Sequence, residues 1–92
     1  MRVYVSGKVT GTTDYMERFQ YAEEYLMSLG YTVINPAAVN ARLPLDTTWE
    51  EYMKISFTLL ELCDAIFMLD DWEDSRGAKL EHAYAVKHSY TI

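Results

Sequence analysis

The sequence has 92 residues, half of them hydrophobic, which is enough for one small domain with a single core, residues 1–92. Its formal net charge of −6 argues against a surface for polymeric nucleic acid, because binding a phosphate backbone needs a clustered basic face. No apolar run is long enough to span a membrane, and no secretory leader is recognisable. The only cysteine, Cys63, excludes an internal disulfide, and we expect it to pack in the core. Together these features lead us to expect a cytoplasmic protein.

The first part of the chain is predicted to form a strand followed by a helix. Residues 3–5 are β-branched or aromatic, which is typical of a strand. Thr12 or Thr13 then caps a helix that runs to Leu29, and Gly30 ends it. Apolar residues at helical spacing predict a stripe that faces the core, formed by Phe19, Ala22, Leu26 and Leu29.

The middle of the chain is predicted to hold a second strand, a long loop and a second helix. Residues 31–34 have the composition of a strand, and Asn35 and Pro36 are predicted to end it. Residues 37–46 contain a proline and no clear period, which predicts a loop of the kind that often carries function. Thr47 or Thr48 opens the next helix, and one face of that helix carries Tyr52, Ser56, Leu59 and Leu60.

The last part of the chain is predicted to form a buried strand, an acidic loop, a helix and a final strand. Residues 65–69 are continuously apolar, as in a parallel sheet that is covered on both faces. The acidic loop at residues 70–74 follows, and Asp74 or Ser75 caps the last helix. Residues 90–92 read as a short final strand.

This alternation of strands and helices predicts an α/β fold. Consecutive βαβ units with right-handed crossovers give a small open parallel sheet of about four strands flanked by helices, flavodoxin-like or Rossmann-like in style. A nicotinamide-binding domain is not expected, because the loop after the first strand reads SGKVTG and lacks the pattern GxGxxG. A P-loop is excluded for lack of its GK[ST] motif.

Glu81 lies on the helix face that should be apolar. At about 100° per residue it shares that face with Gly77, Ala78 and Ala85, which are too small to cover a carboxylate. A buried charge costs several kcal/mol unless it is paired or hydrogen-bonded. Glu81 therefore lines a pocket, pairs with a lysine or arginine elsewhere, or lies on a helix edge that is more solvated than the spacing implies. The pocket hypothesis also uses the first amides of this helix, at Arg76 and Gly77, which could bind an anion.

No metal or other cofactor is expected. The acidic residues between 70 and 74 could hold Mg²⁺, but such a run is more often a solvated loop. His82 and His88 have no cysteine or histidine partner at zinc spacing, so we interpret both as surface residues.

Five motifs, VYVSG (3–7), GYTVINP (30–36), WEEY (49–52), CDA (63–65) and WEDSRGAKLEH (72–82), together resemble a small DUF4406-like family of unknown function from phages and bacteria. That family is related to nucleoside 2-deoxyribosyltransferases, so the resemblance implies their fold. The most specific segment, SRGAKLE, is similar to the helix-opening motif of these enzymes and of deoxynucleoside 5′-monophosphate N-glycosidases.

The resemblance implies that Glu81 is a nucleophile, that Tyr4 lies near it and that Ser75 contacts a 5′-phosphate. A carboxylate held against C1′ stabilises the oxocarbenium-like transition state and captures the sugar as an ester, as in retaining glycosidases. If a second base then accepts the sugar from this ester, the protein is a transferase; if water does so, it is a hydrolase. Tyr4 could equally be a core aromatic residue. The candidate substrate-binding residues are Gly7, Lys8, Ser56, Asp71, Ser75 and Gly77.

Two positions depart from the active relatives. Ser56 stands where they carry an aspartate that contacts the sugar, and Lys8 stands near the position of a phosphate-binding arginine. The second hypothesis is therefore a catalytically inactive nucleoside- or nucleotide-binding module. A third is an interaction domain whose eight tyrosines and two tryptophans form an interface. The expected partner is a small-molecule nucleoside or nucleotide, and we expect a homo-oligomer.

Overall fold

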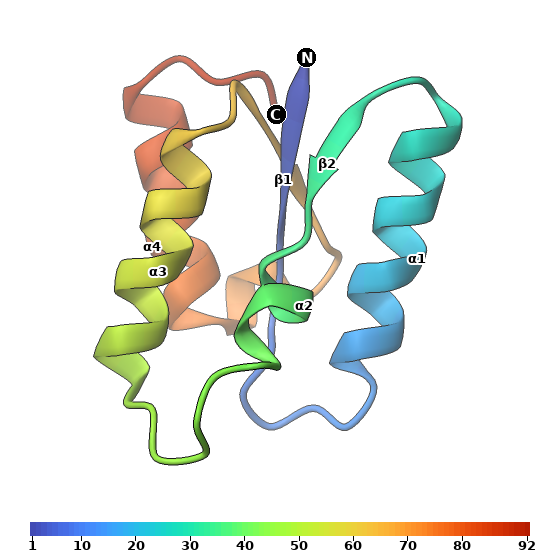
Figure 1. The fold of residues 1–92 in the computed structure, drawn as a ribbon. Coiled ribbons are helices and arrows are strands. Elements are labelled where there is room, and N and C mark those ends of the chain that lie inside the picture. The colour runs from blue at the N-terminus through green and yellow to red at the C-terminus, as the bar shows by residue number, and fades with distance from the viewer.

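The computed structural model describes all residues from 1 to 92 and alternates strands with helices (Figure 1). No helix has the length and apolar character that crossing a membrane requires. In chain order the elements are β1 (Arg2–Ser6), α1 (Tyr15–Ser28), β2 (Thr32–Ile34), α2 (Pro36–Asn40), α3 (Trp49–Glu61), β3 (Ala65–Met68), the 3₁₀ helix η1 (Trp72–Asp74) and α4 (Arg76–Lys87).

The three strands form one parallel sheet in the order β2-β1-β3, which confirms the predicted α/β class. The predicted fourth strand at residues 90–92 is reduced to one bridge between Thr91 and Ala65. The backbone N–H of Tyr90 donates to the Ala85 carbonyl at the end of α4, so Tyr90 takes no part in the sheet.

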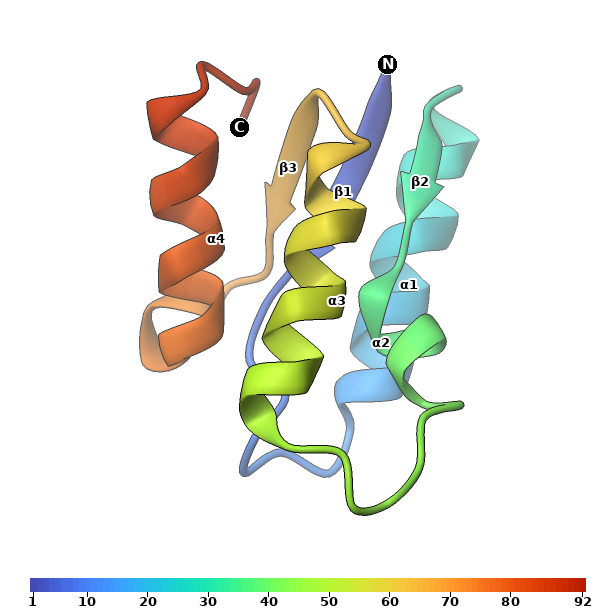
Figure 2. The ribbon, with the colours of Figure 1, turned by 60° about the vertical axis from the view of Figure 1, so that its left-hand side comes forward.

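Helices cover the sheet on both faces (Figures 1 and 2): α1 packs on one face, and α3 and α4 pack on the other. Successive side chains of a strand point to opposite faces. Val3 and Val5 therefore join Phe19 of α1 in one buried cluster, whereas Tyr4 joins Leu60 of α3 in the other. The central strand β1 thus contributes to both halves of the core.

The predicted buried residues are mostly confirmed. Phe19, Ala22 and Leu26 are buried. Leu29 is 55% exposed, because α1 ends at Ser28 and Leu29 is the capping residue beyond it. Cys63 is buried among apolar side chains in the cluster that contains Tyr4.

Part of the predicted loop at residues 37–46 is helical, which corrects the sequence-based assignment. The side-chain oxygen of Asn35 accepts hydrogen bonds from the N–H groups of Ala37 and Ala38 and so caps α2. Pro36 occupies the first helical position, where its missing N–H costs nothing. The Asn-Pro pair thus opens a helix and does not only end the preceding strand.

Two of the other three helix starts, those of α3 and α4, follow the predicted capping chemistry. Thr48 caps α3 in a capping box with Glu51, in which each side chain accepts from the other residue's backbone N–H. Ser75 caps α4, because its Oγ accepts from the N–H of Ala78 at 3.1 Å. For both caps, the second of the two predicted residues is the one that the fold uses. The predicted cap of α1 is wrong, because Asp14 and neither Thr12 nor Thr13 occupies the capping position, and Asp14 makes no side-chain capping hydrogen bond.

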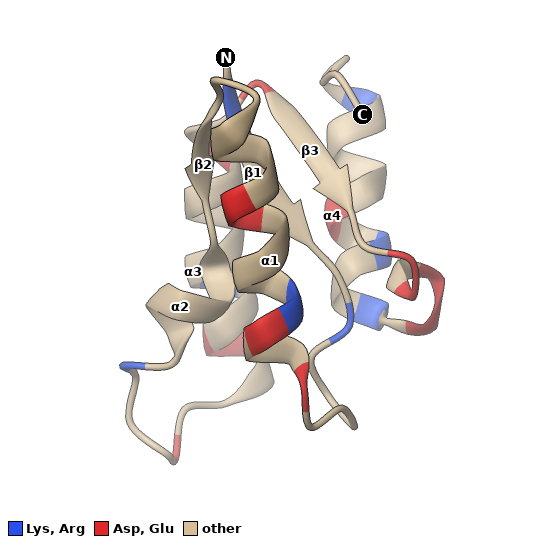
Figure 3. Cartoon of the chain, turned by 90° about the vertical axis from the view of Figure 1, so that its right-hand side faces the viewer, with Lys and Arg blue, Asp and Glu red and all other residues tan.

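Acidic residues gather in the loop between β3 and α4 (Figure 3). Asp71 in this loop forms an ion pair with Arg18 of α1, with 2.7 Å between the nearest nitrogen and oxygen. The acidic side chains of the loop do not converge on a common point, and no three potential metal-ligating side chains lie together in the chain. The loop that follows β3 is therefore tied to α1 by one partly buried ion pair.

Candidate functional site

A cavity of about 340 Å³ lies among the residues that follow β1 and β2 and the first turns of α1, α3 and α4. In open α/β sheets, ligands bind at this end, beyond the carboxyl ends of the strands. Six of the eight residues predicted from the sequence line the cavity: Tyr4, Gly7, Ser56, Ser75, Gly77 and Glu81.

Glu81 is buried, with 6% of its surface exposed, and is held by two hydroxyl groups. The Tyr4 hydroxyl donates to Oε2 of Glu81 at 2.5 Å, and the Ser6 hydroxyl donates to Oε1 at 2.7 Å. The predicted alternative, pairing with a lysine or arginine, is wrong, because the only ion pair in the chain joins Arg18 to Asp71. A carboxylate supported by neutral donors keeps its charge available to a ligand.

Burial and hydrogen bonding act in opposite directions on Glu81. Burial raises the pKa of Glu81 above its ordinary value, and the hydrogen bonds from Tyr4 and Ser6 lower it; burial is the stronger effect. The pKa of Tyr4 is raised well above its usual value, first by burial and then by the charge of Glu81. Tyr4 therefore remains a protonated donor to the carboxylate at neutral pH.

The local structure explains why these three side chains meet. Tyr4 and Ser6 are two residues apart on β1, so both point towards the face covered by α4. Glu81 shares the buried face of α4 with Ala78 and Ala85, whose small side chains bring the helix close to the sheet. Ser6 was not among the predicted site residues, although the period of the strand from Tyr4 could have identified it.

The start of α4 lies in the same cavity wall. The N–H groups of Arg76 and Gly77, its first two residues, donate no hydrogen bond within the chain, as expected at a helix N-terminus. A Cβ added to Gly77 would lie 2.9 Å from the sulfur of Met53, which also lines the cavity. The absence of a side chain at Gly77 thus leaves room for α3 beside α4.

Gly7 lines the cavity, but its packing gives it a structural reason to be glycine. A Cβ at Gly7 would lie 2.7 Å from the side chain of Leu69. The other two predicted residues, Lys8 and Asp71, do not line the cavity. The backbone N–H of Lys8 donates to Asp71 at 3.4 Å, and the Asp71 carboxylate is paired with Arg18.

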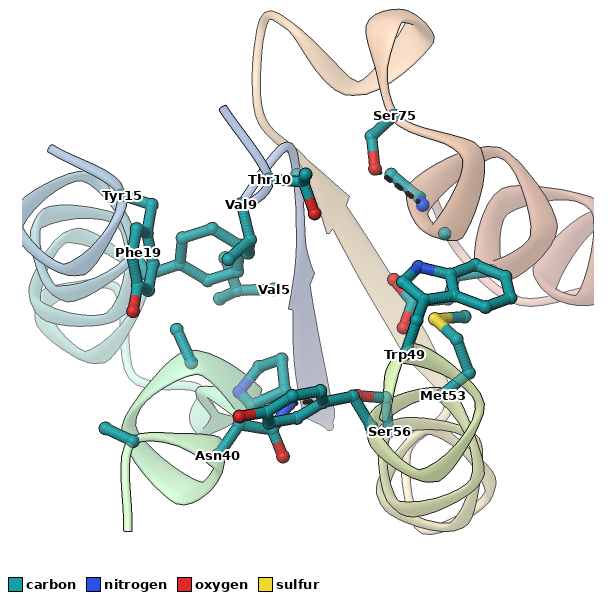
Figure 4. Close-up of a pocket in the computed structure, with 18 of the residues that line it drawn as sticks. Val5, Val9, Thr10, Tyr15, Phe19, Asn40, Trp49, Met53, Ser56 and Ser75 are labelled. Atoms are coloured by element: carbon teal, nitrogen blue, oxygen red, sulfur yellow. Dashed lines mark hydrogen bonds between the residues drawn. The ribbon is translucent and has the colours of Figure 1, made fainter. Parts of the chain in front are cut away.

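The close-up of the cavity shows residues that the sequence-based prediction missed (Figure 4). Trp49, from the first turn of α3, lies beside the start of α4, and the Arg76 guanidinium lies 4.3 Å from the centroid of its ring. Asn40, the last residue of α2, donates through Nδ2 to the Ser56 hydroxyl at 3.3 Å. Only its place in the WEEY motif pointed to Trp49 as a site residue. Nothing in the sequence pointed to Asn40, which lies in the segment predicted to be a loop.

The raised pKa of Glu81 predicts a pH-dependent difference in stability between the wild type and Glu81→Gln. Between the ordinary and the raised pKa, the folded state holds a proton that the unfolded chain has lost, so the contribution of Glu81 to stability falls as the pH rises. Glutamine does not titrate. We therefore expect the free energy of unfolding of the variant to increase relative to the wild type between pH 4 and pH 8, by about 1.4 kcal/mol for each unit of pKa difference.

Urea denaturation of both proteins across this pH range measures that difference. Groups such as Asp71, whose pKa is lowered by Arg18, titrate in both proteins and cancel in the comparison. A difference that stays constant with pH, or one that moves in favour of the wild type, would contradict a raised pKa at Glu81.

Comparison with known proteins gives the family of the chain. Searches of curated proteins and of solved structures return no significant match. A family model described as "Domain of unknown function (DUF4406)" matches residues 1–92, and the chain therefore belongs to this family.

Proposed function

We propose that this protein cleaves or transfers at the N-glycosidic bond of a deoxynucleoside or its 5′-monophosphate, with Glu81 as the nucleophile. The observation that carries the proposal is a buried carboxylate in a cavity wall that two hydroxyl groups support and no cation neutralises. Such a group is costly to keep, so it favours a catalytic role over a purely structural one. The SRGAKLE segment, which ends at Glu81, resembles the helix-opening motif of nucleoside 2-deoxyribosyltransferases, and this resemblance also supports the proposal.

In this mechanism a carboxylate oxygen of Glu81 forms a bond to C1′ while the bond from C1′ to the base breaks. The base leaves with the electron pair and takes up a proton from water. The resulting glycosyl ester is then attacked at C1′ by a second base or by water, which releases the carboxylate. The Tyr4 and Ser6 hydroxyl groups hold Glu81 in one orientation throughout and oppose its protonation.

The rest of the cavity suits the other parts of such a substrate. The free N–H groups of Arg76 and Gly77 and the Ser75 hydroxyl are donors that a 5′-phosphate could use. Tyr15 and Phe19, across the cavity from the start of α4, provide apolar surface for a base. In this proposal the protein is cytoplasmic and forms a homo-oligomer.

Ser56 favours a second candidate function, a nucleotide-binding module without turnover. The active relatives carry an aspartate at this position, whereas here a hydroxyl accepts a hydrogen bond from Asn40. A neutral group cannot support a developing positive charge on the sugar as a carboxylate does. The cavity would then bind a nucleotide without cleaving it.

The experiment that tests the proposal is a base-release assay on a panel of deoxynucleosides and their 5′-monophosphates, followed by chromatography with and without a second free base. We expect release from at least one substrate with the wild type and none above background with Glu81→Ala. Acceleration by the free base identifies a transferase, and release without it identifies a hydrolase. No release from any substrate, with an active relative as positive control, would refute the catalytic proposal; binding without release would support the second candidate.

A further inference from the structure

Asn40 carries the one buried side-chain polar atom in the chain that has no hydrogen-bond partner. This atom is its carbonyl oxygen, Oδ1. Leaving a buried acceptor unsatisfied is costly, and native structures tolerate it rarely. Because Asn40 also lines the cavity, the missing partner is expected to come from a ligand.

The hydrogen bonds around Asn40 determine which end of its amide is free. The ionised Glu81 can only accept, so the Tyr4 hydroxyl donates to it. The hydroxyl of Ser56 lowers the pKa of Tyr4, which is the effect of a donor near the tyrosine oxygen.

The oxygen of Ser56 in turn accepts from Nδ2 of Asn40. Nδ2 is therefore the end of the amide that is already used, and turning the amide over would break this hydrogen bond; Oδ1 is the free atom.

The position of Asn40 indicates which part of a nucleoside would meet it. In Figure 4, Asn40 and Ser75 lie on opposite sides of the cavity. If the start of α4 receives the 5′ end of the substrate and Glu81 faces C1′, the base extends towards Asn40. The surrounding wall includes Pro36 and Tyr52, which offer the apolar contact that a base needs.

We propose that Asn40 selects the base of the substrate, by accepting a hydrogen bond from an exocyclic amino group such as that of adenine or cytosine. This inference rests on the proposed function and adds a specificity-determining residue to it. Oδ1 is recessed, with under 1 Å² of exposed surface. An amino group that projects from the base ring can reach such an atom, whereas an atom in the ring edge lies too far back. The contact needs only a small side-chain shift, of a kind that is common on binding.

Two probes that differ only in the amino group test the proposal by titration calorimetry. They are the carbocyclic analogues of 2′-deoxyadenosine and of purine 2′-deoxyriboside, in which a methylene replaces the ring oxygen and prevents an oxocarbenium ion. We expect wild type to bind the amino-bearing probe about tenfold more tightly, as one hydrogen bond to a buried acceptor allows.

Three variants assign that preference to Asn40. Asn40→Leu removes the acceptor at similar size and is expected to bind both probes equally. Asn40→Asp keeps an acceptor and is expected to retain the preference, which also covers the case in which the leucine variant does not fold. Leu43→Ala, which changes an apolar residue of the same cavity, is the matched control and should leave the ratio unchanged.

The outcomes separate this inference from the proposed function. Equal binding of the two probes by wild type, or a preference that survives in Asn40→Leu, overturns the inference and leaves the glycosidic chemistry of Glu81 intact. Absence of binding by either probe overturns the inference together with the nucleoside site.

Discussion

Replacing Glu81 by glutamine is expected to lower the rate of base release about a thousand-fold or more. The amide is nearly the same size, but it is neutral and cannot form the glycosyl ester. The Tyr4 and Ser6 hydroxyl groups can rotate to accept from the new NH₂ group as well as donate to the remaining oxygen, so the fold should be preserved. Nucleotide affinity should therefore change by less than about tenfold, or 1.4 kcal/mol.

Single-turnover base release and titration calorimetry on the same preparations measure the two effects separately. Glu73→Gln is the matched control, because it removes an exposed carboxylate from the loop next to α4 and should leave both quantities unchanged. A Glu81→Gln protein that releases base within tenfold of the wild-type rate would exclude Glu81 as the nucleophile. Loss of binding with the same variant would instead give Glu81 a role in holding the ligand.

Replacing Leu60 by alanine is expected to lower the free energy of unfolding by about 2–5 kcal/mol. Leu60 is completely buried and belongs to the cluster of Tyr4, Ile66 and Ala85, between α3 and the sheet. The substitution removes this contact and leaves a cavity that a close-packed core fills only in part. For a domain of this size, such a loss is a large share of the total stability.

Leu62→Ala is the matched control, because Leu62 follows two residues later and is 55% exposed. We expect it to cost less than about 0.5 kcal/mol, as is usual for surface substitutions. Urea denaturation of both variants measures the difference. Similar losses for the two leucines would mean that α3 does not pack on the sheet as described.

The starts of α3 and α4 could be predicted from local sequence, because caps act over three or four residues. Thr48 with Glu51 and Ser75 with Ala78 each satisfy backbone N–H groups within one turn. The cap of α1 could not, because the Thr12 hydroxyl donates to the carbonyl of Val9 and Asp14 takes the capping position. The start of α2 was missed for a reason that is also local. Asn35 and Pro36 were interpreted as the end of a strand, although the same pair has the chemistry of a helix cap and first turn.

The ends of elements were harder to predict where two partners compete for the same group. Residues 90–92 have the composition of a strand, but the N–H of Tyr90 serves the end of α4 and only Thr91 reaches β3. Leu29 continues the apolar spacing of α1 but lies beyond its last turn. Periodicity does not indicate which of the competing hydrogen bonds forms.

The sequence by itself determined the α/β class, the strand and helix alternation and the anomaly at Glu81, because each of these follows from periodicity and caps within a few residues. Only the tertiary structure decided what holds Glu81. Tyr4 and Ser6 lie 77 and 75 positions away in the chain, and the parallel sheet with its crossover helices brings them to one face of α4. Likewise, Lys8 and Asp71 carry suitable charges, but the fold directs Asp71 to Arg18 and leaves both outside the cavity. The sequence shows which types of side chain are present. A site also depends on the distances between these side chains, and those distances are set only when elements that are far apart in the chain pack together.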